Sequence, residues 1–172
     1  GDYLKKNYPF IEEVVNIRSD FRPVVKHQGN QLDFRGYFAD QLFYEVFSFN
    51  LISGDPRTAL QHPFSIVLTE KTAQKLYRDE DPIGQTIETD IGTFTVTGIM
   101  EDLKQTHFFF EMLASYETFR ELEKTDLQND WVNYRNNYSY VLLHEEEAKD
   151  QLTTALKETN KQALLFNPNK EI

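Results

Sequence analysis

The chain has 172 residues, which is enough to bury a hydrophobic core without disulfides. Its 28 acidic and 18 basic residues give a net charge of −10, which makes nucleic-acid phosphate and anionic lipid headgroups poor partners. It contains no cysteine, so a disulfide scaffold, a thiolate metal site and a cysteine nucleophile are excluded. The longest stretch without a charged residue, Thr58 to Thr69, is far shorter than the roughly 20 apolar residues of a membrane-spanning helix.

The first residues predict a helix followed by an extended segment. Apolar residues recur at intervals of three and four from Tyr3 to Val15, and Pro9 either divides this helix or starts it. The residues after it, up to Ser19, are expected to be extended. The chain begins inside a helix-like pattern without a clear cap, and we therefore expect a fragment of a longer protein.

The next segment predicts short strands and one short helix. Gly29-Asn30 is typical of a hairpin turn, here between strands at 24–26 and 32–34. Asp40 is a candidate cap for a short helix with an apolar side. The run Ser53-Gly-Asp-Pro predicts a turn after it.

The middle of the chain has the clearest local pattern. Ser65 to Leu68 is a short apolar strand, and Thr69 is the expected N-cap of a helix that continues through Tyr77. Pro82 cannot continue this helix, so an acidic turn ends it. A hairpin is expected around Asp90-Ile-Gly, because the glycine accommodates the positive φ of such a turn.

The last third alternates strands and helices. We expect a strand at 108–111, a helix capped by Ser115, a polar loop at 124–137, a strand at 138–143 and a helix over about 146–161. Hairpins with about five short helices indicate an α+β fold rather than a doubly wound sheet.

The sequence contains no motif that carries known chemistry. It has no nucleophile elbow, phosphate-binding loop or dinucleotide fingerprint. Its four histidines lie far apart, without zinc-ligand spacing. The acidic run Asp79 to Asp81 lacks the ligand alternation of a calcium loop, and a helix-ending turn explains it better. We therefore predict no catalytic residue, no metal site and no cofactor.

An aromatic-rich block occupies residues 37–49. A ligand groove is one interpretation, but the apolar members fit helical spacing, which favours a small helix packed on a sheet. The block comprises Tyr37, Phe38, Phe43, Tyr44, Phe47 and Phe49.

An ordered set of short elements resembles the periplasmic core domain of MacB-like, FtsX-superfamily ABC transporter permeases. The similarity covers residues 8–119 well and the final strand and helix loosely. Arg78 stands where this family commonly has glycine, and Gln85 where it commonly has lysine. The matching elements are Phe43-Tyr-Glu-Val-Phe-Ser-Phe, Gly54-Asp-Pro, Ser65-Ile-Val-Leu-Thr-Glu-Lys-Thr-Ala, Asp79-Glu-Asp-Pro-Ile-Gly, Phe94-Thr-Val-Thr-Gly-Ile and Thr106-His-Phe-x-Phe.

The resemblance implies a non-catalytic domain in the periplasm, held by an inner-membrane permease between its first two transmembrane helices. Such permeases work as homodimers or heterodimers with a cytoplasmic ABC ATPase, and some contact a periplasmic adaptor. The domain would pass the ATP-driven conformational change to cargo or partner proteins. The implied fold is a porter-like lobe of helices on a small sheet (1–55 with 135–166) and an inserted, hairpin-rich lobe (56–134), within one domain over 1–172.

Two other functions stay open at this point. A free-standing periplasmic binding module would use the aromatic block as its groove. An acid-catalysed hydrolase would rest only on the abundant carboxylates. For partner contacts, the best candidates are the acidic turn of Asp79, Glu80 and Asp81 and the loop around Trp131, because an exposed tryptophan is typical of a binding surface. Trp131 packed over the core is the competing interpretation.

Overall fold

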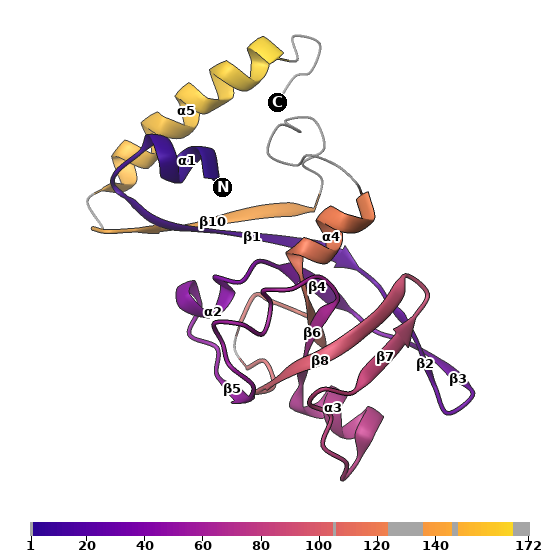
Figure 1. Cartoon of the computed structure of the whole chain (residues 1–172). Helices are drawn as coiled ribbons and strands as arrows, with labels where there is room; N and C mark the ends of the chain where they lie inside the picture. The colour runs from indigo at the N-terminus through magenta and orange to yellow at the C-terminus, as the bar shows by residue number, and fades with distance from the viewer. Residues whose placement is uncertain (1, 105, 124–135, 146–147, 167–172) are drawn as a thin grey trace.

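The computed structural model of the chain describes residues 2–104, 106–123, 136–145 and 148–166. In these residues ten strands form one mixed sheet flanked by five helices, which confirms the predicted α+β class (Figure 1). The strands are β1 (Ile11–Phe21), β2 (Val24–His27), β3 (Asn30–Asp33), β4 (Gly36–Ala39), β5 (Leu51–Ser53), β6 (Ser65–Thr69), β7 (Thr86–Thr89), β8 (Gly92–Met100), β9 (Met112–Ser115) and β10 (Asn137–Leu143). The helices are α1 (Asp2–Asn7), α2 (Phe43–Val46), α3 (Glu70–Tyr77), α4 (Tyr116–Glu123) and α5 (Lys149–Phe166).

The strand order is β10-β1-β4-β9-β6-β8-β7-β2-β3, with β5 paired to β8. Two neighbouring pairs, β4 with β9 and β6 with β8, are parallel, and the other pairs are antiparallel. The hairpin of β2 and β3 joins the sheet through pairing of β2 with β7, although the two strands lie far apart in the sequence. The division into lobes 1–55 with 135–166 and 56–134 stays a prediction.

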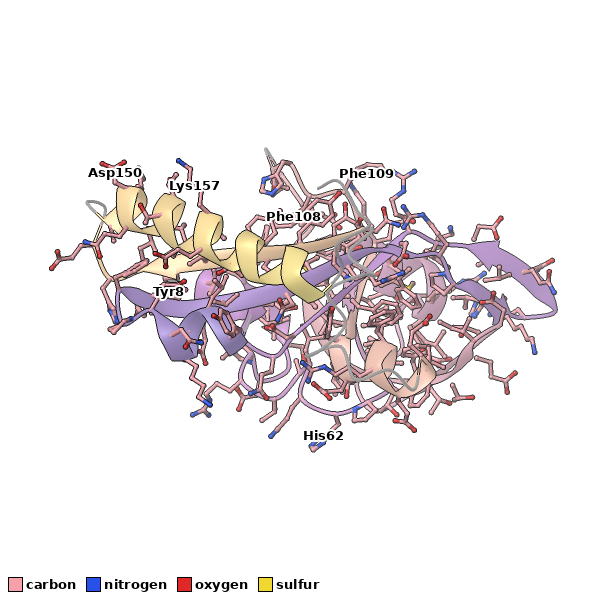
Figure 2. The ribbon with its side chains drawn as sticks, turned by 90° about the horizontal axis from the view of Figure 1, so that it is seen from above. Tyr8, His62, Phe108, Phe109, Asp150 and Lys157 are labelled. Carbon is pink, nitrogen blue, oxygen red and sulfur yellow. The ribbon has the colours of Figure 1, made fainter. Side chains whose placement is uncertain are left out.

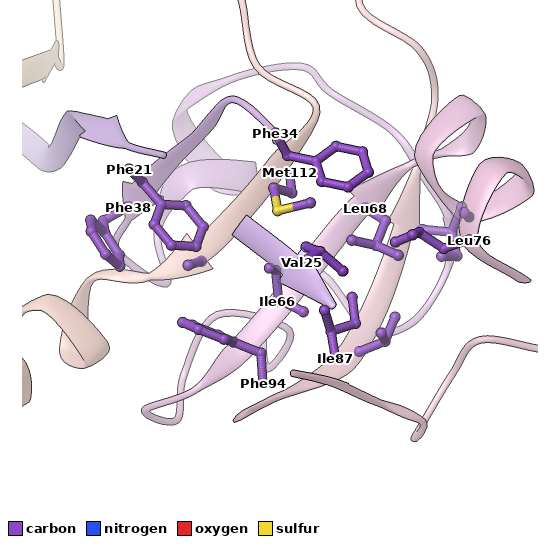
Figure 3. Packing of buried hydrophobic residues seen from close by; sticks show 14 of the residues in the cluster. Phe21, Val25, Phe34, Phe38, Ile66, Leu68, Leu76, Ile87, Phe94 and Met112 are labelled. Atoms are coloured by element: carbon purple, nitrogen blue, oxygen red, sulfur yellow. The ribbon is translucent and has the colours of Figure 1, made fainter. Parts of the chain in front are cut away.

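Each face of the sheet buries its own hydrophobic cluster. On one face α3 and α4 cover side chains such as Ile66, Phe94 and Met112 (Figure 3). On the other face α2 and the segment before β9 cover Val67 and Leu113. Alternation along β6 and β9 explains the division, because successive side chains of a strand point to opposite faces.

The predicted first helix is wrong beyond Asn7. The backbone N–H of Tyr8 makes the last helical hydrogen bond, to the carbonyl oxygen of Leu4, and β1 begins at Ile11. Pro9 explains the break, because it has no N–H and disfavours the helical conformation of the preceding residue. The apolar residues after it bury against the sheet instead.

The strand predicted at 108–111 is also wrong. Phe108 and Phe110 are buried and Phe109 is exposed, so the alternation is present, but the segment joins β8 to β9 without strand pairing. β9 starts at Met112.

Several local predictions are confirmed. The Thr69 hydroxyl accepts a hydrogen bond from the N–H of Thr72 and caps α3. The hairpin of β7 and β8 turns at Asp90 and Ile91, and Gly92, which pairs with Thr89 after the turn, has a φ of +148°. The hairpin of β2 and β3 also forms, but its turn lies one residue earlier, at Gln28 and Gly29 with φ of +49° and +78°.

None of the helices within the described residues is both long enough and apolar enough to cross a membrane.

Candidate partner-contact surfaces

The acidic turn follows α3 directly and is exposed at all three positions. The Asp81 carboxylate accepts a hydrogen bond from the N–H of Ile83 at 3.0 Å, and its carbonyl oxygen accepts one from the Gln85 side chain at 2.6 Å. Asp81 thus shapes the connection from α3 to β7, while Asp79 and Glu80 present their carboxylates to solvent. A contact role for the three residues stays a proposal. Trp131 lies outside the described residues.

The aromatic block packs as core on two faces of the sheet. Phe43 of α2 is fully buried and stacks on Phe49, with ring centroids 5.5 Å apart and planes 4° apart. Phe38 points to the opposite face, where it meets Phe21 at 4.6 Å. The packing interpretation of this block is therefore confirmed for these rings.

Tyr44 of α2 has a buried hydroxyl that makes no hydrogen bond with any residue the structure describes. Burial alone raises the pKa of this phenol, because the ionised form would lose its hydration. A phenol that stays neutral and lacks a neighbouring base is suited to packing rather than proton transfer.

Within the part of the chain that the structure describes, Phe109 is the most exposed large hydrophobic residue, with 65% of its surface accessible. The Arg35 guanidinium lies 4.3 Å from its ring centroid. The Glu111 carboxylate accepts from the N–H of Arg35 at 2.9 Å, which fixes the corner next to the ring. An ordered cation over an exposed aromatic ring is suited to contact with another protein. The contact predictions missed Phe109, although its alternation with two buried neighbours was visible.

A second exposed aromatic surface lies on β10. Tyr138 is 52% exposed, and Tyr140 stands two residues away on the same face of the strand. The Tyr140 hydroxyl is 3.0 Å from Nε2 of His107, and its ring packs edge-on against Phe47. Burial raises the pKa of Tyr140, with the nearby Tyr37 and Tyr138 acting in the same direction.

The first and last helices meet above β1 and β10 (Figures 1 and 2). The Tyr8 hydroxyl lies 3.4 Å from the carbonyl oxygen of Ala155 and 3.3 Å from a carboxylate oxygen of Glu158. Ala155 of α5 is buried, and so is Ala148, the residue before this helix. The two ends of the described chain are thus joined on one side of the sheet.

Of the described acidic groups with a displaced pKa, Asp40 is the most buried. Burial raises this pKa, and hydrogen bonds to its carboxylate oppose the shift. Its Oδ2 accepts from the N–H of Asn16 at 2.7 Å and its Oδ1 from the N–H of Leu42 at 3.1 Å. Asp40 therefore ties β1 to the start of α2, as a connecting residue rather than a free acid. Among the described residues, no three His, Asp or Glu side chains are close enough together to hold a metal ion.

Comparisons with known proteins identify the family and the fold of the chain. A family model described as MacB-like periplasmic core domain matches residues 1–159. No curated protein matches the chain. Among solved structures, a domain assigned to a permease protein of Porphyromonas gingivalis has a TM-score of 0.76 at 19% identity, over 94% of this chain and 75% of that one.

Two further solved structures share the fold. The periplasmic region of MacB from Actinobacillus actinomycetemcomitans has a TM-score of 0.69 at 17% identity, over 94% of this chain and 71% of its own. The extracellular domain of the noncanonic ABC-type transporter YknZ from Gram-positive bacteria has a TM-score of 0.67 at 16% identity, over 96% of this chain and 81% of its own. At these identities the likeness establishes the fold.

Proposed function

Because the chain belongs to the MacB-like periplasmic core domain family, we propose that it is the periplasmic domain of an inner-membrane ABC transporter permease. In this role it is non-catalytic and passes an ATP-driven movement from the membrane to cargo or to partner proteins. Its partners are a second permease subunit, a cytoplasmic ABC ATPase that acts through the membrane part, and a periplasmic adaptor.

The observation that carries this proposal is the joining of α1 and α5 on one face of β1 and β10. If both helices lead to the membrane, they form the input of the domain. Tyr8 holds them together, so a displacement of either helix moves the other.

β1 provides a path from these helices into the body of the sheet. Its first residues contact α1 and pair with β10, and its last residues pair with β4 at Ile17, Arg18 and Phe21. Val15 and Ile17 are buried in one core cluster and Phe21 in the other. Because packed cores resist deformation, a shift of this strand displaces both faces together.

We assign the output of the domain, its contacts with cargo or adaptor, to the exposed Phe109 with Arg35, to the exposed acidic turn from Asp79 to Asp81, and to Trp131, which lies outside the described residues. The observed chemistry of the first two, a cation on an aromatic ring and an exposed acidic turn, fits protein partners.

Spin-label distances in the complete gene product test the proposal without knowledge of the cargo. Labels at Lys157 of α5 and Lys26 of β2 span the input helices and the sheet body. We expect their distance distribution to change when ATP binds the assembled transporter. Labels at Lys26 and Lys71 both lie on the body and should keep their distance. Unchanged distances for the first pair during ATP turnover contradict the proposal.

A further inference from the structure

β10 forms one end of the sheet and pairs with β1 along its inner side. Its sequence, Asn-Tyr-Ser-Tyr-Val-Leu-Leu, contains neither a charge nor a proline. Natural proteins usually protect an edge strand with charged residues, prolines or bulges, because an unprotected edge pairs with other strands. An uncharged edge of seven residues is notable in a chain with a net charge of −10.

The backbone hydrogen bonds at the two ends of β10 show which groups face outward. The carbonyl oxygen of Asn136 accepts from Ser19, and the N–H of His144 donates to Phe10, so both of these residues face β1. Successive residues of an antiparallel strand direct their backbone groups to opposite edges. The backbone groups of Ser139, Val141 and Leu143 therefore point away from the sheet.

We propose that β10 pairs with β10 of a second copy of this chain, antiparallel and centred on Tyr140. Ser139 then lies opposite the second copy's Val141, with outward backbone groups on both strands. Tyr138 lies opposite the second copy's Leu142, and the two Tyr140 residues face each other. Aromatic–aromatic and aromatic–aliphatic pairs stabilise neighbouring strands, and this register brings no like charges together.

The symmetry of such a pair agrees with a membrane anchor, and this step rests on the proposed function. Two antiparallel edge strands are related by a two-fold axis perpendicular to the sheet. Rotation about that axis leaves each face of the sheet on its own side. Since α1 and α5 lie above β1 and β10, both copies would direct these helices to the same side, as one membrane requires (Figure 1).

The side chains of β10 suit an interface that forms between folded copies. Tyr138 pairs with Ile17 of β1 and is 52% exposed, so its ring is accessible to a neighbouring strand. Tyr140 is held by Phe47 and His107 before any pairing takes place. Ordered aromatic side chains lose little entropy when they become buried in a contact.

Cysteine cross-linking tests the register directly, because the chain has no cysteine of its own. Membranes containing the complete gene product would carry copies with Ser139→Cys mixed with copies with Val141→Cys. We expect the mixture to form disulfides at least about tenfold faster than either variant alone, because pairing raises the effective concentration. Tyr140→Cys should cross-link with itself. Ile52→Cys, at a position 53% exposed on β5, is the control for random collision.

A second pair of variants tests the interface without cysteine. Tyr138→Lys places a charge at the edge, whereas Ile52→Lys adds the same charge at equal exposure on β5. We expect Tyr138→Lys to reduce self-association of the 172-residue chain in sedimentation equilibrium, and Ile52→Lys to leave it unchanged. Equal cross-linking of the Ser139/Val141 mixture and Ile52→Cys would overturn the inference. The spin-label experiment above would still decide the proposed function, since it does not depend on β10.

Discussion

The hydroxyl of Ser115 donates a hydrogen bond to the carbonyl oxygen of Leu60 at 2.8 Å, and both residues are fully buried. Ser115 also accepts from the N–H of Glu117 at 3.3 Å, at the start of α4. One side chain thus joins the end of β9 to a segment that crosses the other face of the sheet, and it caps the next helix.

Ser115→Ala should lower the free energy of unfolding by about 1–3 kcal/mol, because it leaves a buried carbonyl oxygen unpaired and removes the cap. Urea unfolding followed by circular dichroism measures the change. Ser48→Ala, at an exposed position, is the matched control and should change stability by less than about 0.5 kcal/mol. Equal stability of the two variants would show that the Leu60 carbonyl finds another partner.

The local rules that predicted this region succeed where a cap, a turn residue or strand alternation decides the structure. Thr69 and Gly92 are examples, because their roles depend on neighbours within three residues. The partners of distant segments were not predictable in this way. The approach of Leu60 to Ser115 depends on sheet order, and the position of Tyr8 under α5 depends on packing across 147 residues of sequence.

The candidate contact residues also differ in whether local sequence or the order of strands determines their exposure. The exposure of Asp79 to Asp81 follows from their charge and from their place in the connection after α3. Phe109 could have been inferred from its position between two phenylalanines of opposite orientation. The place of β10 at the end of the described sheet could not, because the order of strands in a sheet is a property of the whole chain.

Asp40 predicts a specific pH dependence of stability. Burial raises the pKa of Asp40 in the folded protein above its ordinary value of 3.8, so the folded state binds this proton more tightly than the unfolded state does. The contribution of protonated Asp40 to the free energy of unfolding is fully present below pH 3.8, and it is lost as the pH rises through the pKa of Asp40 in the folded protein. Asp40→Asn should therefore lose less stability than the native chain as the pH rises from about 3.8 towards neutrality.

Parallel urea titrations of both proteins at several pH values isolate this effect, since other groups titrate equally in both. The difference in unfolding free energy between Asp40→Asn and the native chain should move in favour of the variant across this window. A constant difference would show that the hydrogen bonds from Asn16 and Leu42 fully compensate the burial.

Phe108 and Phe109 are adjacent, but truncation to alanine should lower stability much more at Phe108 than at Phe109. Phe108→Ala removes a buried ring that meets Phe43, Phe47 and Tyr140, and should cost about 3–5 kcal/mol of stability. Phe109→Ala should change stability by less than about 1 kcal/mol, because the ring is exposed apart from its contact with Arg35. Thermal unfolding measures both.

Transport by the assembled permease tests whether Phe109 contacts a partner. With Phe109 as a partner contact, Phe109→Ala should reduce transport while its melting temperature stays near that of the native chain. Normal transport by a stable Phe109→Ala variant would remove Phe109 from the proposed output surface.

Arg78 occupies a position that favours glycine. Its φ of +54° and ψ of −109° match the first central residue of a type II′ turn, and the N–H of Glu80 donates to the carbonyl oxygen of Tyr77 at 3.0 Å to close that turn. Arg78→Gly should therefore stabilise the chain by up to about 1 kcal/mol, because relief of strain exceeds the added entropy of the unfolded chain.

Arg78→Ala is the matched control, since it removes the guanidinium but keeps the Cβ that this backbone conformation disfavours. Urea midpoints should place Arg78→Gly above the native chain and Arg78→Ala at or below it, with unchanged slopes. If Arg78→Ala matches Arg78→Gly, the charge rather than the backbone limits stability at this turn. Since Asp79 to Asp81 follow Arg78, a stabilised turn that leaves transport intact would also separate the shape of the acidic turn from its proposed contacts.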